Sequence, residues 1–256
     1  MASAVSPEFL AAFRQTAGDG GAMSFARFME LALYHPDAGY YAQRRRRIGR
    51  TPEADFFTAT SLGPVFGELV VAACVALLDQ RPPHDHTFVE IGAESPAGGY
   101  PETLPLCPVE GAAPSAPLGY MAALRARRAR RPPVPDVSRI ASSDQATPGG
   151  VLAGVAHPFA SVATITLGQP LQLPARAVVF SNELFDAQPC HRLVRQAGRW
   201  REGGVALRDD ALEEVLLPEL TPEVQAVHDR LPTSAPDGYR IDLPLAAAQL
   251  AERIAA

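Results

Sequence analysis

Thr87-Phe-Val-Glu-Ile-Gly92 is the stretch that decides the fold of this chain. It is a short β-prone run ending in glycine, which is how the first strand of a nucleotide- or nucleoside-binding α/β unit begins. Residues 161–167 and 175–180 are also expected to be strands. The second of these is a continuous apolar run, which is typical of a buried position in a parallel sheet. The sequence therefore predicts an α/β fold.

Two helices are expected before this first strand. Ser24 is a suitable N-cap for a helix that reaches Tyr34. This helix must end near His35-Pro36, because proline disfavours the helical conformation in the residue before it. A second helix is expected over 61–79, with apolar residues recurring on one face. That face consists of Leu62, Val65, Phe66, Leu69, Val70, Ala73, Cys74 and Leu77.

The chain after the third strand carries signals for both helices and strands. Residues 191–196 and 199–202 flank Ala197-Gly198 and are expected to pair as a hairpin. The remaining candidates are helices over 210–217, 222–230 and 244–255 and a strand over 239–243.

An insertion is expected between about residues 100 and 150. The segment is rich in proline, alanine and arginine and cannot bury enough apolar surface to offset its ordering entropy, so it is predicted to be disordered. It is bracketed by a near repeat, Ser95-Pro-Ala-Gly-Gly99 and Thr147-Pro-Gly-Gly150. Removing the segment joins the end of the first strand to Val151 and restores a strand, a glycine turn and a helix start.

The composition excludes several classes of chemistry. The chain has 256 residues, a net charge of −5 and no lysine, so all 23 basic residues are arginine. Without lysine there is no Schiff-base chemistry and no P-loop lysine. His84 and His86 flank Asp85, but no second ligand pair follows at zinc-site spacing, so no metal site is expected.

The sequence favours a cytoplasmic protein. Its 3 cysteines form no paired framework, which indicates reduced thiols. The first residues lack the basic and apolar regions of a signal peptide. The longest apolar stretch, residues 69–78, is shorter than the roughly 20 residues that a membrane span needs. Neither a membrane nor a leader is therefore expected.

Two arginine runs raise the question of nucleic-acid or lipid binding. Residues 44–47 are four adjacent arginines, and residues 125–131 carry five more. The chain is acidic overall and aromatic residues are not interleaved with either run, so solvated loops are the better interpretation. Nucleic acid is accordingly not expected as a partner.

Three stretches together resemble the MidA family, the SAM-dependent methyltransferase family of the mitochondrial complex I assembly factor. The first is Ser24-Phe-Ala-Arg-Phe-Met-Glu-Leu-Ala-Leu-Tyr-His-Pro-Asp-Ala-Gly-Tyr-Tyr41. The second is Ala54-Asp-Phe-Phe-Thr-Ala59 leading to Phe66-Gly67, and the third is Phe180-Ser-Asn-Glu-Leu-Phe-Asp-Ala-Gln-Pro189. Their order and spacing fit the family once the insertion is set aside. The family's mitochondrial member is a protein arginine methyltransferase.

The resemblance implies a Rossmann-like SAM-dependent methyltransferase fold. Residues 1–80 would form an N-terminal helical extension, and residues 81–256 the methyltransferase domain. S-adenosyl-L-methionine would lie across the carboxyl ends of the strands, where open α/β sheets bind ligands. The implied cofactor-binding residues are Glu90, Gly92, Ala93, Gly98 and Gly99.

The resemblance also implies a reaction centre formed by Asn182, Glu183 and Asp186, on the loop after a central strand. Carboxylates suit a protein arginine substrate, because they pair bidentately with a guanidinium and hold one nitrogen toward the methyl donor. The alternative is that Asn182 caps a turn and Asp186 caps a short helix.

The chain departs from the family pattern at the expected cofactor site. Glu94 stands where the family has a second glycine. No carboxylate follows the second strand at Leu167-Gly-Gln-Pro170, where the family has one for the ribose hydroxyls. Two functions are therefore weighed: a methyltransferase acting on protein arginine, and a catalytically degenerate member that keeps the fold and acts as a binding or assembly partner.

Overall fold

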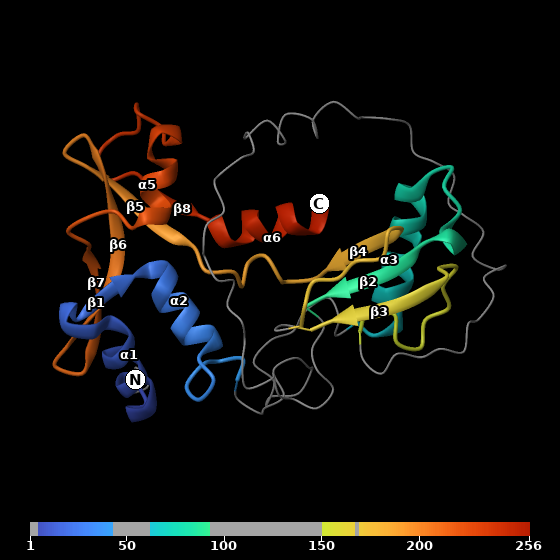
Figure 1. Cartoon of the computed structure of the whole chain (residues 1–256), viewed down its shortest axis with the longest axis horizontal. Helices are drawn as coiled ribbons and strands as arrows, with labels where there is room; N and C mark the ends of the chain where they lie inside the picture. Colours follow the sequence, from blue (N-terminus) through green and yellow to red (C-terminus); the bar gives the residue numbers. More distant parts are fainter. Residues whose placement is uncertain (1–4, 43–61, 93–149, 167–168) are drawn as a thin grey trace. The chain divides into compact units, whose positions relative to one another are not determined.

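A computed structural model describes residues 5–42, 62–92, 150–166 and 169–256 (Figure 1). These residues form two compact units. Unit 1 comprises the described residues 5–42 and 183–256, and unit 2 comprises 62–92, 150–166 and 169–182. Each unit is built from both the early and the late part of the chain.

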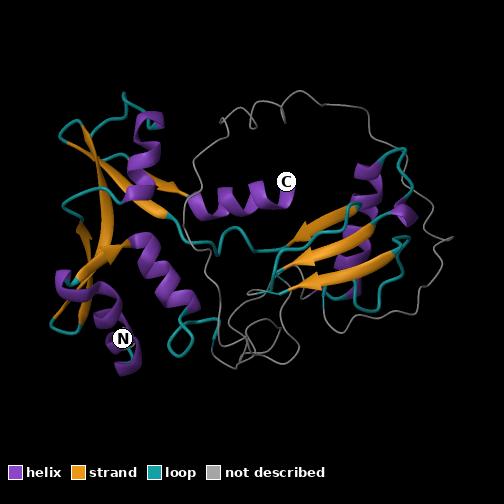
Figure 2. Cartoon of the chain, in the orientation of Figure 1, coloured by secondary structure: helices purple, strands orange, loops and turns teal. Residues whose placement is uncertain are grey.

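Unit 2 contains a parallel sheet in the order β3-β2-β4 (Figure 2). Its strands are β2 (Thr87–Ile91), β3 (Ser161–Ile165) and β4 (Ala177–Ser181). Ile91 at the end of β2 pairs with Ile165 of β3 and with Ser181 of β4. The three predicted strands are confirmed, and their carboxyl ends lie at one edge of the sheet.

Helix α3 (Pro64–Leu78) packs on this sheet and closes the core of unit 2. The helix approaches the chain after the sheet's first strand very closely, since a Cβ at Gly67 would lie 2.4 Å from the carbonyl oxygen of Val151. The buried core consists of Val70, Val71, Cys74, Leu78, Phe88, Val151, Leu152, Val155 and Phe159. A short 3-10 helix, η3 (Pro83–Asp85), leads into β2.

The apolar face predicted for this helix is correct in part, since Val70 and Cys74 are buried as expected, but the buried side is rotated toward Val71 and Leu78. Val71 and Leu78 are buried, whereas Leu69 and Leu77 are 60% and 78% exposed. Leu62 and Val65 are exposed as well. The face that carries Gly67 is the one that can approach the backbone at Val151, so packing turns this side inward. Apolar residues occur on more than one side of this helix, so periodicity alone does not indicate which side is buried.

The helix start predicted at Val151 is also corrected. Residues 151–154 form a turn in the structure rather than a regular helix. The turn still buries Val151 and Leu152 in the core of unit 2. The backbone of a turn, rather than the N-terminus of a helix, therefore lies at the carboxyl end of β2.

Unit 1 contains an antiparallel sheet in the order β1-β6-β5-β8, with β7 also pairing with β6. The strands are β1 (Ala22–Ser24), β5 (His191–Gln196), β6 (Arg199–Arg208), β7 (Ala211–Leu216) and β8 (Arg240–Leu243). Its helices are α1 (Pro7–Ala17), α2 (Phe25–Tyr34), α5 (Pro222–Val227) and α6 (Leu245–Ala255), with 3-10 turns η1 (Gly18–Gly20) and η5 (His228–Arg230). The predicted hairpin at Ala197-Gly198, the strand near residue 240 and the last two helices are confirmed.

Helix α2 begins and ends as its sequence predicts. Ser24 is the N-cap, and its side-chain oxygen accepts a hydrogen bond from the Arg27 N–H at 3.2 Å. His35, directly before proline, is the C-cap. One side of the helix packs with α1 and the antiparallel sheet around a core of Ala12, Phe13, Met23, Leu31 and Val205.

The helix predicted over 210–217 is wrong, because this segment is strand β7. Arg208 of β6 pairs with Ala211 of β7, so Asp209 and Asp210 are the two residues of a tight hairpin turn. Their φ angles are 48° and 63°, in the left-handed region that such turns require. Aspartate tolerates this conformation better than most residues, so a pair of them permits the turn.

A buried carboxylate fixes the chain that follows β7. Glu202 is fully buried, and its Oε1 lies 2.7 Å from Nδ1 of His191 on the neighbouring strand. The Thr221 N–H donates to Oε2 of Glu202 at 2.7 Å, and the Thr221 hydroxyl donates to Oε1 at 3.1 Å. These bonds attach the start of α5 to the sheet and satisfy both carboxylate oxygens.

Candidate functional site

The candidate site begins at Glu90, near the carboxyl end of β2. Glu90 is 6% exposed, and its Oε2 accepts a hydrogen bond from the Val151 N–H at 2.6 Å. The two residues are 61 positions apart in the sequence. The carboxylate therefore fixes the turn over 151–154 at the carboxyl end of the strand.

Gly150 makes this contact possible. Its φ is +100°, and a Cβ at this position would lie 2.7 Å from Oε2 of Glu90. Any side chain would both strain the backbone and collide with the carboxylate. Glycine at 150 and a carboxylate at 90 are thus matched to each other.

Burial raises the pKa of the Glu90 carboxyl, and the hydrogen bond from the Val151 N–H opposes this effect by lowering it. Desolvation disfavours the charged form, while a donor aimed at the oxygen favours it. Glu90 therefore has one short hydrogen bond, from Val151 in the turn, while burial disfavours its charged form.

Gly92 is the first residue beyond β2, with a φ of +83°. Its N–H donates to the carbonyl oxygen of Ile165, the last residue of β3, at 2.8 Å. Because Ile91 pairs with Ser181, Gly92 and Asn182 leave the sheet at the same edge. The structure thus brings Glu90, Gly92 and Asn182 to one edge of unit 2, and adds Gly150.

Gln169 is a residue at this edge that sequence reasoning missed. It lies just beyond β3, and its Oε1 accepts a hydrogen bond from the Thr166 N–H at 2.9 Å. This bond orients the exposed side chain with its Nε2 as the remaining donor. The signal in the sequence was a polar side chain shortly after a strand, where a carboxylate was expected instead.

Glu183 and Asp186 belong to unit 1, whereas Asn182 is the last residue of unit 2. Both carboxylates are exposed, and Asn182 is partly buried. Glu183 has a φ of +50°, an uncommon conformation for a residue with a side chain, and such strain occurs often at functional loops.

Hydrogen bonds within the loop and from α2 hold the segment that carries these carboxylates. Oδ1 of Asp186 accepts from the Ala187 N–H at 3.1 Å. The Tyr34 hydroxyl on α2 donates to the Ala187 carbonyl oxygen at 2.8 Å, and the Gln188 side chain donates to the Leu184 carbonyl oxygen at 3.0 Å. Residues 184–187 contain no helix, so the alternative of Asp186 as a helix cap is replaced by a local turn contact.

Several predicted features lie outside the described residues. These are Ala93, Gly98 and Gly99 of the expected cofactor site, Glu94, residues 100–149 of the expected insertion and both arginine runs. Within the described ranges, no group of three or more His, Cys, Asp and Glu side chains is placed to hold a metal ion. None of the helices in those ranges is both long and apolar enough to cross a membrane.

The later part of the chain matches the model of a protein family. Residues 162–256 match the model of a family described as "Putative S-adenosyl-L-methionine-dependent methyltransferase". This match covers β3, β4 and the loop with Asn182, but not Glu90 or Gly92. No curated protein matches the chain.

Two solved structures from Burkholderia thailandensis share the fold. One is a COG1565 superfamily member bound to S-adenosyl-homocysteine, with 22% identity and a TM-score of 0.55. The other is a native structure from the same superfamily, with 21% identity and a TM-score of 0.51. Each alignment covers 96% of this chain, but only 60% and 58% of the two solved chains. The family match spans less than half of this chain, and the two solved structures share its fold.

Proposed function

We propose that this protein is a SAM-dependent methyltransferase of the MidA type that methylates arginine side chains of a protein substrate in the cytoplasm. The observation that carries the proposal is the hydrogen bond from the Val151 N–H to Glu90. It assembles a strand, a left-handed glycine and a turn at the carboxyl edge of a parallel sheet, where α/β folds bind their ligands. The family match over 162–256 supports the same class.

The residues at this edge fit the cofactor in part. Gly92 and Gly150 offer backbone without side chains, which suits close approach by the methionine end. Gln169 offers an amide donor after β3, where a carboxylate for the ribose was expected. Bound SAM supplies a methyl group on a positively charged sulfur. Glu90, already engaged by Val151, holds the turn in place.

An arginine substrate is supported by the loop after β4. Asn182 follows the strand directly, and Glu183 and Asp186 present exposed carboxylates. Carboxylates pair with a guanidinium in fixed geometry, which is what positions one nitrogen for reaction. Transfer of a methyl group depends mainly on such positioning and requires little covalent chemistry from the protein.

Calorimetric titration with S-adenosyl-homocysteine tests the proposal. The informative pair of variants is Glu90→Gln and Glu90→Ala, because glutamine keeps an oxygen for the Val151 N–H and alanine does not. We expect wild type and Glu90→Gln to bind, and Glu90→Ala to lose about 10-fold or more in affinity as the turn is released. Thermal unfolding of each variant controls for loss of structure.

Absence of binding by the wild type up to millimolar ligand would overturn the proposal and favour the catalytically degenerate reading. If binding is present, transfer of labelled methyl from SAM to arginine-containing and lysine-containing peptides tests the substrate. Label on the lysine peptide alone would contradict the arginine assignment. Glu183→Gln is expected to lower methyl transfer while leaving S-adenosyl-homocysteine binding unchanged.

A further inference from the structure

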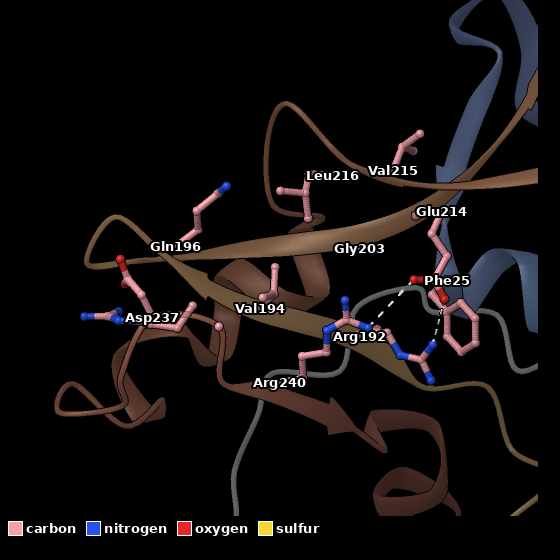
Figure 3. A pocket seen from close by; sticks show the side chains of 13 residues that line it. Phe25, Arg192, Val194, Gln196, Gly203, Glu214, Val215, Leu216, Asp237 and Arg240 are labelled. Carbon is pink, nitrogen blue, oxygen red and sulfur yellow. Dashed lines mark hydrogen bonds and ion pairs between the residues drawn. The ribbon is translucent and has the colours of Figure 1, made fainter.

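Unit 1 contains a groove of about 390 Å³ over its antiparallel sheet (Figure 3). This volume lies within the range of ligand pockets in proteins. The groove is lined by Phe25 and by residues of β5, β6, β7 and β8, including Arg192, Gly203, Glu214, Leu216 and Arg240. None of the residues assigned above to the methyltransferase site lines it.

The floor of the groove is open because Gly203 has no side chain. A Cβ there would lie 3.3 Å from the Arg192 carbonyl oxygen, a tight contact that a shift of a few tenths of an ångström relieves. Gly204 differs, since a Cβ there would lie 2.4 Å from the Met23 carbonyl oxygen and prevent the pairing with β1. Beside the open floor lie Val194 and Leu216, which give the groove an apolar middle.

One guanidinium at the groove is held rigidly. Nε and Nη2 of Arg192 lie 3.0 and 3.4 Å from the two carboxylate oxygens of Asp242. The guanidinium carbon of Arg192 also lies 4.0 Å from the centre of the Phe25 ring. Such a group is already ordered before a ligand arrives, which lowers the entropy cost of binding.

A carboxylate of the protein itself occupies the position between two guanidiniums. Oε1 of Glu214 lies 3.3 Å from Nη1 of Arg192, and Oε2 lies 3.9 Å from Nη1 of Arg240 (Figure 3). The Glu214 and Arg240 side chains are 62% and 67% exposed. Exposed pairs of this kind are weak, so Glu214 can be exchanged for another carboxylate.

The other acidic side chain that lines the groove already accepts two backbone hydrogen bonds. Asp237 accepts hydrogen bonds from the N–H groups of Ala197 and Gly198 at 3.0 and 3.1 Å, which cap the β5–β6 turn. Glu214 is therefore the exchangeable anion, and its departure leaves Arg192 and Arg240 facing the groove. The site then complements a carboxylate next to an apolar group.

We propose that this groove binds an extended segment of the protein substrate in which an acidic side chain lies next to apolar residues. The substrate carboxylate takes the place of Glu214 between Arg192 and Arg240, and the apolar residues cover Val194, Gly203 and Leu216. The identity of the partner as a substrate rests on the proposed methyltransferase function, whereas carboxylate binding does not.

The test uses the full chain and the peptide acetyl-Gly-Glu-Leu-Leu-Gly-amide, with its glutamine analogue as the neutral control. Calorimetry or fluorescence anisotropy gives the affinities. We expect Arg240→Gln to weaken binding of the acidic peptide about 5-fold, and Glu214→Gln to strengthen it about 3-fold by removing the competing carboxylate. Both effects should shrink as salt is raised, since exposed charges are screened.

Arg208→Gln is the matched control. Arg208 is 67% exposed, like Arg240, and pairs with Glu213 at 3.6 Å outside the groove. It should bind the peptide as wild type does. Gly203→Leu fills the floor and should abolish binding, and thermal unfolding controls for strain against the Arg192 backbone.

The two substitutions of opposite expected sign make the proposal falsifiable. If Arg240→Gln and Glu214→Gln shift affinity in the same direction, or neither shifts it, the groove is not a carboxylate site. Equal affinity for hexanoate and for the peptide would identify a small-molecule site and overturn substrate docking. S-adenosyl-homocysteine titrated into the same preparation separates the two proposals, because its binding does not depend on the groove.

Discussion

At the scale of single residues, the buried carboxylate of Glu90 links β2 to the turn that begins at Val151. Glu90 lies in a buried strand, accepts one hydrogen bond at 2.6 Å and contacts Gly150, where any side chain would be strained. A group of this kind stabilises one local arrangement of the chain at the expense of its own solvation. Its energetic effect should therefore depend on its charge.

The pH dependence of stability provides a test of this cost. Burial raises the folded-state pKa of Glu90 above its ordinary value of 4.5, so the neutral form is favoured in the folded state. The associated stabilisation is present below 4.5 and is lost as the pH rises through the folded-state pKa. Glu90→Gln keeps an acceptor for Val151 without a charge, so its unfolding free energy relative to wild type should increase from pH 4 upward.

Urea unfolding at a series of pH values measures this difference. Glu219→Gln, at an exposed carboxyl in unit 1, is the matched control for the same chemical change without burial. A difference for Glu90→Gln that stays flat with pH, or falls, would contradict the role of desolvation at this position.

At the scale of elements, the turns of the antiparallel sheet determine which segments become strands. The β5–β6 turn at Ala197-Gly198 has φ angles of 49° and 69°, and the β6–β7 turn has two aspartates at 48° and 63°. Left-handed residues in both central positions match the twist of paired strands. The second turn contains two aspartates, for which left-handed angles are less favourable than for glycine. Substitutions at these positions can therefore stabilise the hairpin.

Replacing the pair by Asp209→Asn and Asp210→Gly should raise the unfolding free energy by about 0.5–1 kcal/mol, because asparagine and glycine adopt left-handed angles more readily. The exposed ion pair between Asp210 and Arg14 is lost, but pairs of this kind contribute little. Gly198→Ala should act in the opposite direction at the first turn. Chemical denaturation checks both, and a loss of stability in the double variant would contradict the hairpin.

Local signals predicted most elements, and tertiary contacts decided the exceptions. The Ser24 cap, the proline after His35 and the β-prone run at Thr87 each act within a few residues, so α2 and β2 could be foreseen. The inward face of α3 depends on Gly67 meeting Val151, and the strand state of 211–216 depends on pairing with β6. Neither partner is visible within the segment itself.

Some residues of the candidate site could likewise be foreseen from the sequence, and others could not. Glu90 and Gly92 stand out in sequence because they end a strand, and Asn182 because it follows one. Gln169 was missed, and the hydrogen bond accepted by the Glu90 carboxylate could not be foreseen without knowing where Val151 lies. The groove around Arg192 could not be foreseen, since four strands and α2 contribute to it.

At the scale of the whole molecule, the contact between Glu90 and Val151 predicts how the expected insertion can be removed. The two residues are hydrogen-bonded, and a few residues after Gly92 can therefore reach Gly150. Replacing 100–148 by a short glycine-serine linker should preserve the fold and, by shortening the loop, raise the unfolding free energy by about 1–2 kcal/mol. Circular dichroism and thermal unfolding measure the outcome.

A linker variant that fails to fold would contradict the prediction of a disordered insertion, because it would show that the replaced residues contribute to a core. Recovery of S-adenosyl-homocysteine binding in a folded variant would show in addition that the replaced residues are not needed to hold the ligand. Gly150→Ala in the same background is the control, and should lower stability through its collision with Glu90.

The interleaving of early and late chain segments has a consequence for synthesis. Strand β1 pairs with β6, and β2 pairs with β3 and β4, so each unit needs residues from both halves of the sequence. While the ribosome is still translating the middle of the message, α1, α2 and α3 have no sheet to cover, and their apolar sides are open to chaperones. Unit 2 is complete only after β4 and unit 1 only after β8, so the nascent protein stays dependent on its surroundings until its final third has emerged.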